Sequence, residues 1–293
     1  MKPIKLIITI MALLFLTGCA PSDTNAQIAA TTLPVWEFSS RICEGTPISV
    51  TRLVTEQVSC LHDYSLNVRQ VKAAESADAI VISGAGLEDF LNDLLLDAPV
   101  IDASDGIPLL CGGEEHDHDA HDGEGHHHEE DPHIWLSPEN AVIMARNICD
   151  GLSLLYPDYS ETFDRNLKTL ISELEQLQEY GSSILADLQC RDLITFHDGF
   201  SYFAEAFDLS ILEAVEEESG SEASARELID LIEDVREHTL PAVFTEVSGS
   251  TSAAGVIARE TGCSVYALDM AMSGDSYFEA MYHNIDTIKE ALG

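Results

Sequence analysis

Residues 157–188 read PDYSETFDRNLKTLISELEQLQEYGSSILADL, and this stretch decides how the rest of the chain is organised. Apolar residues recur in it at helical spacing, at Phe163, Leu167, Leu170, Leu174 and Leu177. About 30 helical residues would span roughly 45 Å. A coiled coil is the alternative, but the Gly181-Ser182-Ser183 run and the lack of further heptads argue against it. We therefore expect a rigid helix that connects two halves of the chain.

Both flanks of this helix show short apolar runs that alternate with longer stretches of helical periodicity. This alternation is typical of parallel α/β units. We expect strands at residues 27–32, 49–54, 79–83 and 99–101 in the first half and at 193–196, 210–214, 242–245 and 264–268 in the second. The sequence therefore predicts an α/β fold with two similar halves, residues 27–156 and 189–293, around a linking helix at 157–188.

The chain starts with the features of an export signal. Lys2 and Lys5 precede an apolar stretch at 6–16, which is shorter than the ~20 residues that a membrane-spanning helix needs. Leu16-Thr17-Gly18-Cys19 resembles a bacterial lipobox, which implies a lipoprotein signal peptide at residues 1–18 and a lipid on Cys19. Residues 19–26 would then form a lipid-anchored tether. We therefore expect an exported protein on the outer face of the cell membrane.

The formal net charge is −38, with 52 acidic residues against 14 Lys and Arg. Nucleic acid is not expected as a partner, because phosphate contacts need clustered basic side chains. A strongly negative protein does raise the local concentration of cations. The composition therefore argues against nucleic-acid binding and is compatible with a cationic ligand.

Six cysteines remain when Cys19 is set aside, and exported proteins commonly form disulfides. Cys43–Cys60 is the pairing that we expect first, because a loop of about 17 residues would contribute roughly 3 kcal/mol. This disulfide would also brace the segment that carries His62. The chain has no Cys-x-x-Cys pair that would indicate a structural zinc site. The full pairing stays open among Cys43, Cys60, Cys111, Cys149, Cys190 and Cys263.

Seven of the 11 histidines lie between residues 114 and 133, among nine carboxylates. Imidazole is a ligand for zinc, copper and nickel, so this density indicates transition-metal binding. Within this stretch we expect an acidic, His-rich loop at 112–132 that collects metal ions weakly. Its accessory ligands would be His116, His118, His121, His126, His127 and His128.

Four other polar residues occupy positions that favour a defined site. His62, His197 and Asp269 follow predicted strands, and ligands of open α/β sheets bind beyond the carboxyl ends of strands. His133 lies at the edge of the acidic run, where two prolines restrict the backbone and Ser137-Pro138 has the pattern of a helix start. Each residue alone has a structural explanation, such as a buried histidine or a turn cap, but the joint pattern predicts one site.

The segments around these residues resemble a known family. His62-Asp63-Tyr64 looks like its His-x-Tyr segment, and residues 131–136 (DPHIWL) match its Asp-Pro-His-x-Trp-Leu motif. Residues 196–204 (FHDGFSYFA) resemble its His-x-x-Phe-x-Tyr-Phe-Ala segment, and Leu268-Asp269 resembles its last strand. The family is that of the metal-binding, substrate-binding lipoproteins of bacterial zinc and manganese ABC transporters. Leu66 and Ser137 depart from it, since a proline and an aspartate are usual at these places.

The resemblance implies two lobes, each with a four-stranded, mainly parallel sheet, joined by a long backbone helix with the metal in the cleft between them. The implied ligands are His62, His133, His197 and Asp269. Three imidazoles and one carboxylate suit tetrahedral zinc, whereas manganese prefers more oxygen ligands and is the alternative. The implied function is capture of Zn²⁺ outside the cytoplasm and delivery to the permease of an ABC transporter, by a monomer.

Two other classes of function remain as alternatives. A surface metal buffer or adhesin would depend on the His-rich loop rather than on the cleft. An exported zinc hydrolase would need an open coordination position and a general base, for which Glu213, Glu216, Glu217, Glu218 and Glu246 are candidates. The chain has no His-Glu-x-x-His and no Gly-x-Ser-x-Gly motif, so we do not expect an enzyme.

Overall fold

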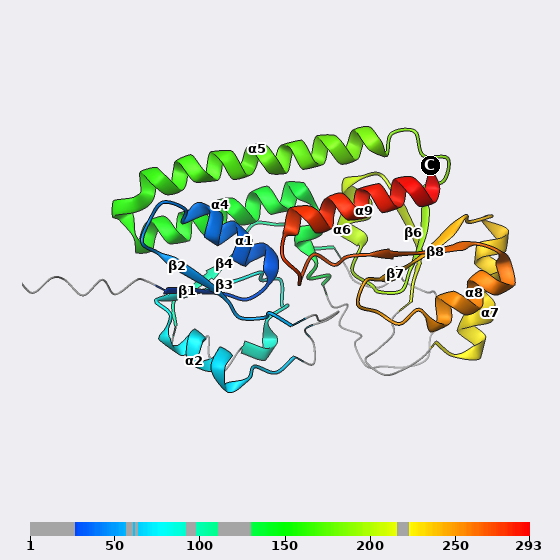
Figure 1. The fold of residues 1–293 in the computed structure, drawn as a ribbon, viewed down its shortest axis with the longest axis horizontal. Helices are drawn as coiled ribbons and strands as arrows, with labels where there is room; N and C mark the ends of the chain where they lie inside the picture. The colour runs from blue at the N-terminus through cyan, green and yellow to red at the C-terminus, as the bar shows by residue number, and fades with distance from the viewer. Residues whose placement is uncertain (1–26, 57–60, 62–63, 92–97, 111–129, 216–222) are drawn as a thin grey trace, which may run out of the picture.

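A computed structural model describes residues 27–56, 61, 64–91, 98–110, 130–215 and 223–293. The chain forms two α/β lobes that lie next to each other along one long helix (Figure 1). The predicted fold class is therefore confirmed. All eight predicted strands are present, and their ends agree with the predicted ends within two residues.

The N-terminal lobe contains a parallel sheet with the strand order β2-β1-β3-β4. Its strands are β1 (Gln27–Ala30), β2 (Ser49–Arg52), β3 (Ala79–Ile82) and β4 (Val100–Asp102). The C-terminal lobe repeats this arrangement with the order β6-β5-β7-β8. Its strands are β5 (Asp192–Thr195), β6 (Ser210–Ala214), β7 (Ala242–Glu246) and β8 (Ser264–Leu268).

Each sheet has a topological switch point, where the strand order reverses between two central strands. It lies between β1 and β3 in the N-terminal lobe and between β5 and β7 in the C-terminal lobe. Crevices at the carboxyl ends of such strands are the usual ligand sites of open parallel sheets. The topology therefore offers one such position in each lobe.

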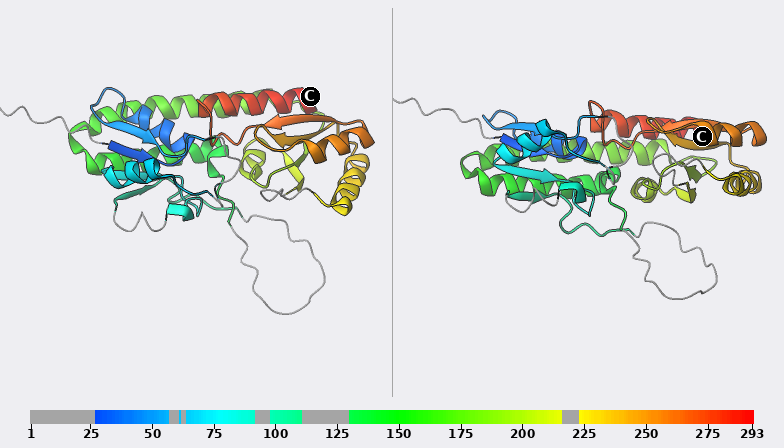
Figure 2. Two further views of the ribbon diagram at one scale, coloured as in Figure 1. Left: turned by 60° about the horizontal axis from the view of Figure 1, so that its bottom comes forward. Right: turned by 90° about the horizontal axis from the view of Figure 1, so that it is seen from below.

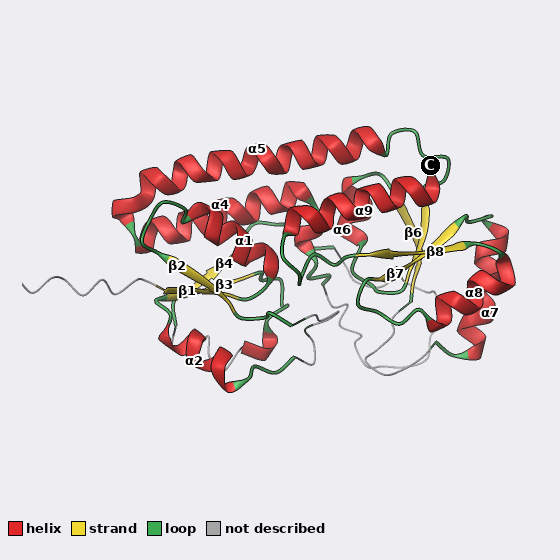
Figure 3. Ribbon diagram, viewed as in Figure 1, coloured by secondary structure: helices red, strands yellow, loops and turns green. Residues whose placement is uncertain are grey.

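Helices cover both faces of each sheet (Figure 3). One continuous apolar core joins the linking helix α5 (Ser160–Ile184) to the near faces of both sheets through four helices. These are α1 (Leu33–Ile42), α4 (Pro138–Leu155), α6 (Ser201–Ala206) and α9 (Tyr277–Leu292). Smaller cores lie on the far faces, under α2 in one lobe and under α7 and α8 in the other. These helices span Val68–Ser76, Ala225–Glu237 and Ser252–Thr261.

The linking helix α5 spans Ser160–Ile184 and follows a short 3-10 turn at Pro157–Tyr159. Figure 2 shows it alongside both lobes. At 1.5 Å per residue it is about 37 Å long, which is shorter than predicted because the chain leaves the helix after Ile184. The guanidinium of Arg191 donates to the carbonyls of Leu185 and Ala186, the first two residues after the helix, at 3.0 Å each.

A glycine on α5 allows an aromatic side chain of the C-terminal lobe to contact the helix backbone. A Cβ atom at Gly181 would overlap the ring of Phe207, which is buried. The apolar stripe predicted for this helix is also present, with Phe163, Leu170, Leu174 and Leu177 buried. The helix therefore packs on both lobes.

Several predictions fall on residues outside the described part of the chain. These are the signal peptide and tether, Cys19, most of the His-rich loop, His62, Cys60 and Cys111. The expected Cys43–Cys60 disulfide is not supported, because Cys43 is a free thiol in the structure. Cys43 follows α1 and is buried in the main core, together with Cys149 of α4. None of the described helices is both long and apolar enough to cross a bilayer.

Candidate metal site

His133 is held by a rigid turn between two buried segments. It precedes the 3-10 turn at Ile134–Leu136, whose three side chains are completely buried. Ser137 then caps α4, because its Oγ accepts from the backbone N–H of Asn140 at 3.3 Å and Pro138 is the first helical residue. The predicted helix start is therefore confirmed, and it fixes the backbone next to His133.

The ring of His133 is oriented by Asp131. The side chain of His133 is only 3% exposed, and its Nδ1 lies 2.8 Å from Oδ1 of Asp131. The same oxygen also accepts from the backbone N–H of His133 at 2.9 Å. A carboxylate only accepts hydrogen bonds, so the neutral ring carries its proton on Nδ1 and presents a lone pair on Nε2.

His197 has the same arrangement in the C-terminal lobe. It lies two residues beyond the end of β5, and its Nδ1 is 2.8 Å from Oε1 of Glu246. Glu246 is the last residue of β7, is 5% exposed, and thus reaches His197 across the switch point of this lobe. The neutral ring of His197 therefore also presents Nε2 as a free lone pair.

The two Nε2 atoms face each other. They are 3.4 Å apart, and the ring planes make an angle of 81° with centroids 5.1 Å apart. Because both Nδ1 protons are directed to carboxylates, two neutral rings have no proton to share between the Nε2 atoms. Two converging nitrogen lone pairs, each oriented through the opposite ring atom by a carboxylate, are the arrangement of histidine ligands around a metal ion.

The environment shifts the pKa values of the two histidines in opposite directions. Burial lowers the pKa of His133, although the hydrogen bond to Asp131 acts against this effect. Burial also acts to lower the pKa of His197, but the hydrogen bond and the charge of Glu246 outweigh it, so the pKa of His197 is raised. His133 is therefore held neutral, while His197 is the more basic of the pair.

Gly199 leaves the space in which the two rings approach each other. A Cβ atom at this position would lie 2.7 Å from Cδ2 of His197 and 2.9 Å from Cε1 of His133. It would also lie 2.7 Å from Cε of Met270, the residue after Asp269. Three of the predicted ligand segments therefore converge on this one glycine.

Asp269 lies directly after β8, as predicted, and is half-buried. The side chain of Asn284 on α9 binds the backbone of Asp269 through two hydrogen bonds of 2.7 Å. Oδ1 of Asp269 accepts from the N–H of Ala271 at 2.8 Å. Burial raises the pKa of Asp269, and the hydrogen bond from Ala271 acts against this effect. Its carboxylate does not join the two histidines in a metal-holding group, and the described residues contain no group of three metal-binding side chains. His62 lies outside the described residues.

Three site residues were missed by the sequence analysis. Asp131 was predicted only as part of a motif, Glu246 only as a candidate base, and Gly199 was not predicted as a site residue. The signal for Asp131 was available, since a carboxylate two residues before a histidine can reach its ring nitrogen. Glu246 could be found only by knowing that β5 and β7 are neighbours.

Comparisons with known proteins give the family of the chain. The family described as the zinc-uptake complex component A, periplasmic (ZnuA) matches residues 28–291. The zinc-binding lipoprotein AdcA of Streptococcus pneumoniae (strain ATCC BAA-255 / R6) is 31% identical over 308 residues, which cover 99% of this chain and 61% of the relative. The chain thus spans about three fifths of the length of that relative.

Two solved structures have the same fold. A crystal structure of ZnuA superposes with a TM-score of 0.78 at 30% identity and covers 92% of this chain and 100% of the other. The Zn(II)-bound ZnuA-like domain of Streptococcus pneumoniae AdcA gives a TM-score of 0.77 at 27% identity, with 92% and 99% covered. Together with the match over residues 28–291, this likeness establishes that the chain belongs to the ZnuA family of periplasmic zinc-uptake components.

Proposed function

We propose that this protein captures Zn²⁺ outside the cytoplasm, in the cleft between its lobes, and delivers the ion to the membrane permease of an ABC transporter. The observation that carries the proposal is the pair of Nε2 atoms 3.4 Å apart, one from each lobe, with each ring oriented by a buried carboxylate. A pair of ligands with one residue in each lobe suits reversible capture. When the lobes separate, the two histidines move apart and can no longer bind the same ion.

The proposed ligands are His62, His133, His197 and Asp269. The neighbours of His62 support its part in the set. Leu61 is 1% exposed and its carbonyl accepts from the N–H of Tyr64 at 3.0 Å, so the chain on both sides of His62 is anchored. Imidazole nitrogens favour zinc over manganese, which prefers oxygen ligands. We therefore propose zinc as the cargo, with manganese as the alternative.

The remaining parts of the proposal rest on the sequence and on the family. The six accessory histidines between residues 116 and 128 would collect zinc ions weakly before one enters the cleft. A lipid on Cys19 would hold the protein, as a monomer, on the outer face of the membrane near the permease. The streptococcal relative carries the name zinc-binding lipoprotein, which supports such an anchor.

Hydrolysis by a cleft-bound zinc ion is disfavoured by the position of Glu246. A general base must be free to take a proton from a metal-bound water. Glu246, a candidate base that contacts the histidine pair, instead has Oε1 2.8 Å from Nδ1 of His197. This contact supports a role of the carboxylate in orienting a proposed ligand, as expected of a binding protein.

The function is tested by the metal content of the protein purified without an affinity tag. We expect one tightly bound zinc ion per chain in the wild type and its loss in His197→Ala. His238→Ala is the matched control, because His238 is an exposed histidine that follows α7 in the same lobe. Tight zinc binding that persists in His197→Ala would contradict the proposal.

A deletion of residues 114–130 distinguishes zinc binding in the cleft from zinc binding by the His-rich loop. We expect one tight zinc site per chain to survive this deletion and the weak binding to disappear. If the tight site is lost with the loop while His197→Ala retains it, the protein is a surface metal buffer or adhesin. Competition against a chelating dye measures both classes of site.

A further inference from the structure

The segment that follows Asp269 is attached to the N-terminal lobe, although β8 belongs to the C-terminal lobe. The carbonyl of Met272 accepts from the N–H of Leu33 on α1 at 3.2 Å. Two residues later, the carbonyl of Gly274 accepts from Nη1 of Arg52 on β2 at 2.7 Å. The chain thus crosses from one lobe to the other directly after its proposed zinc ligand.

Two further hydrogen bonds, both buried, connect the chain that follows Asp269 to the turn that follows His133. Nε1 of Trp135 donates to the carbonyl of Met270 at 2.7 Å, and the hydroxyl of Tyr277 donates to the carbonyl of Trp135 at 2.8 Å. Both hydrogen bonds are buried, and the side chains of Trp135 and Tyr277 are completely inaccessible. Trp135 is two residues from His133, and Met270 is next to Asp269. Two hydrogen bonds therefore join the turn that follows His133 to the chain that follows Asp269, near two proposed ligands from opposite halves of the sequence.

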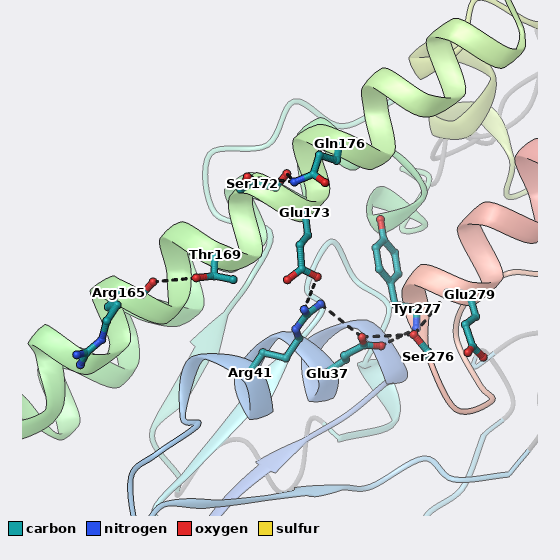
Figure 4. Close-up of polar contacts among 10 residues, drawn as sticks. All are labelled: Glu37, Arg41, Arg165, Thr169, Ser172, Glu173, Gln176, Ser276, Tyr277 and Glu279. Carbon is teal, nitrogen blue, oxygen red and sulfur yellow. Dashed lines mark hydrogen bonds and ion pairs between the residues drawn. The ribbon is translucent and has the colours of Figure 1, made fainter.

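Tyr277 is itself held from the N-terminal lobe (Figure 4). Its backbone N–H donates to Oε2 of Glu37 on α1 at 2.6 Å, and the ring of Phe38 packs edge-on against its ring at 5.0 Å. Glu37 is in turn 3.8 Å from Nη1 of Arg41, which forms an ion pair with Glu173 on α5. The start of α9 is therefore connected through α1 to the linking helix.

We propose that Tyr277 is a positioning residue for zinc binding, which keeps the Asp269 segment in register with His133 through its hydrogen bond to Trp135. Asp269 then keeps its place relative to the N-terminal lobe when the lobes separate, and His197 is the ligand that moves away. This inference rests on the proposed function, because it requires Asp269 and His133 to bind the same ion.

The test is the zinc dissociation rate of Tyr277→Phe, in protein loaded with one equivalent of zinc and mixed with an excess of a chelating dye. The variant removes the hydroxyl and keeps the buried ring. Loss of one buried hydrogen bond corresponds to about a fivefold faster release. Tyr180→Phe is the matched control, because Tyr180 also ties α9, through a bond of 2.6 Å to Asp286, but far along the helix from Asp269. We expect its release rate to equal that of the wild type.

A double-mutant cycle separates positioning from general loosening of the fold. In an Asp269→Asn background, Tyr277→Phe should no longer change the release rate, because the ligand that it positions is already removed. An equal effect of Tyr277→Phe in both backgrounds would overturn the inference. So would a Tyr277→Phe rate equal to that of Tyr180→Phe.

If Tyr277→Phe does not fold, a second variant tests the same inference. Arg52→Met removes the bond to Gly274 at a more accessible place, and it should accelerate zinc release in the same direction, again only when Asp269 is present. An unchanged release rate in Arg52→Met would then overturn the inference. A wild-type protein that binds no zinc would instead contradict the proposed function.

Discussion

At the scale of single residues, Gly199 determines how closely the two histidine rings approach each other. It follows His197 by two residues, and a methyl group there would meet carbon atoms of His197, His133 and Met270 at less than 3.0 Å. At least one of these side chains would have to move to make room. The absence of a side chain at this position is therefore part of the proposed site.

We expect Gly199→Ala to weaken zinc binding by about tenfold, because overpacking a well-filled site costs roughly 1–3 kcal/mol. The measurement is zinc affinity by competition with a chelating dye. Gly255→Ala is the matched control, since a Cβ atom at Gly255 on α8 would meet only the Arg259 guanidinium, at 4.0 Å. It should leave zinc affinity unchanged and stabilise the helix by up to about 1 kcal/mol. Wild-type affinity in Gly199→Ala would show that the rings do not need this space.

The sequence predicted His197 and Asp269 because each follows an apolar run that forms a strand. His133 was predictable because its motif and the flanking prolines restrict the chain. Glu246 and Gly199 were not predictable, because their roles depend on distances across the sheet and between lobes. Hydrophobic periodicity locates a strand but does not say which strand lies beside it.

At the scale of secondary-structure elements, the two switch points differ in what fills them. In the C-terminal lobe the ends of β5 and β7 supply His197 and Glu246. In the N-terminal lobe the corresponding place beyond β1 and β3 is filled by Glu88, which is 4% exposed. Its carboxylate accepts from the Oγ1 of Thr31 and the N–H of Ser83, both at 2.7 Å. The N-terminal switch point is therefore occupied by a side chain of the protein itself.

This buried carboxylate gives a pH-dependent contribution to stability. Burial raises the pKa of Glu88 to about 7, against an ordinary value of 4.5. The folded state therefore holds this proton more tightly than the unfolded state. Its stabilising contribution is complete below pH 4.5 and is lost as the pH rises through about 7.

We expect Glu88→Gln to remove this component. The free energy of unfolding of the variant minus that of wild type should increase by up to about 3 kcal/mol between pH 4.5 and 7.5, because only the wild type loses stability over this range. Urea unfolding across this range measures the difference. Glu75→Gln, at an exposed glutamate of α2, is the control for the substitution itself. A difference in Glu88→Gln that does not change with pH would contradict the raised pKa of Glu88.

The elements were largely predictable, but their ends were less so. Ser137 and Pro138 marked the start of α4 because a cap and a first-turn proline act locally. The end of α5 was predicted too late, at residue 188 instead of Ile184. The chain has no proline or glycine there, and Arg191, which follows as a separate segment, donates to the carbonyls of Leu185 and Ala186 just after the helix. A bond of this kind leaves no periodic signal.

At the scale of the whole molecule, the main core is shared between the lobes. It contains Val81 and Ile101 from the first sheet and Leu193 and Phe244 from the second, joined through α5 residues such as Leu174. Neither lobe buries all of its apolar surface without α5. The two sheets are therefore parts of one cooperative structure rather than independent domains.

We expect the zinc-free protein to unfold in one transition. Calorimetry should give a single heat-absorption peak, because the shared core must be exposed at once. Both tryptophans, Trp36 and Trp135, lie in the N-terminal half, so their fluorescence reports on that lobe, whereas circular dichroism reports on all helices. The two signals should change at the same urea concentration. Separate midpoints would show that the lobes unfold independently.

The contact between Gly181 and Phe207 limits how the lobes can move. The ring of Phe207 lies on the backbone of α5 at the one glycine of that helix. Four residues away on either side, Leu177 on the helix and Leu185, its C-cap residue, have large buried side chains. A slide of one turn, about 5.4 Å, would place a leucine where the ring now lies. A translation of the C-terminal lobe by one turn along the helix would therefore require these leucines to move, whereas a tilt about this contact would not.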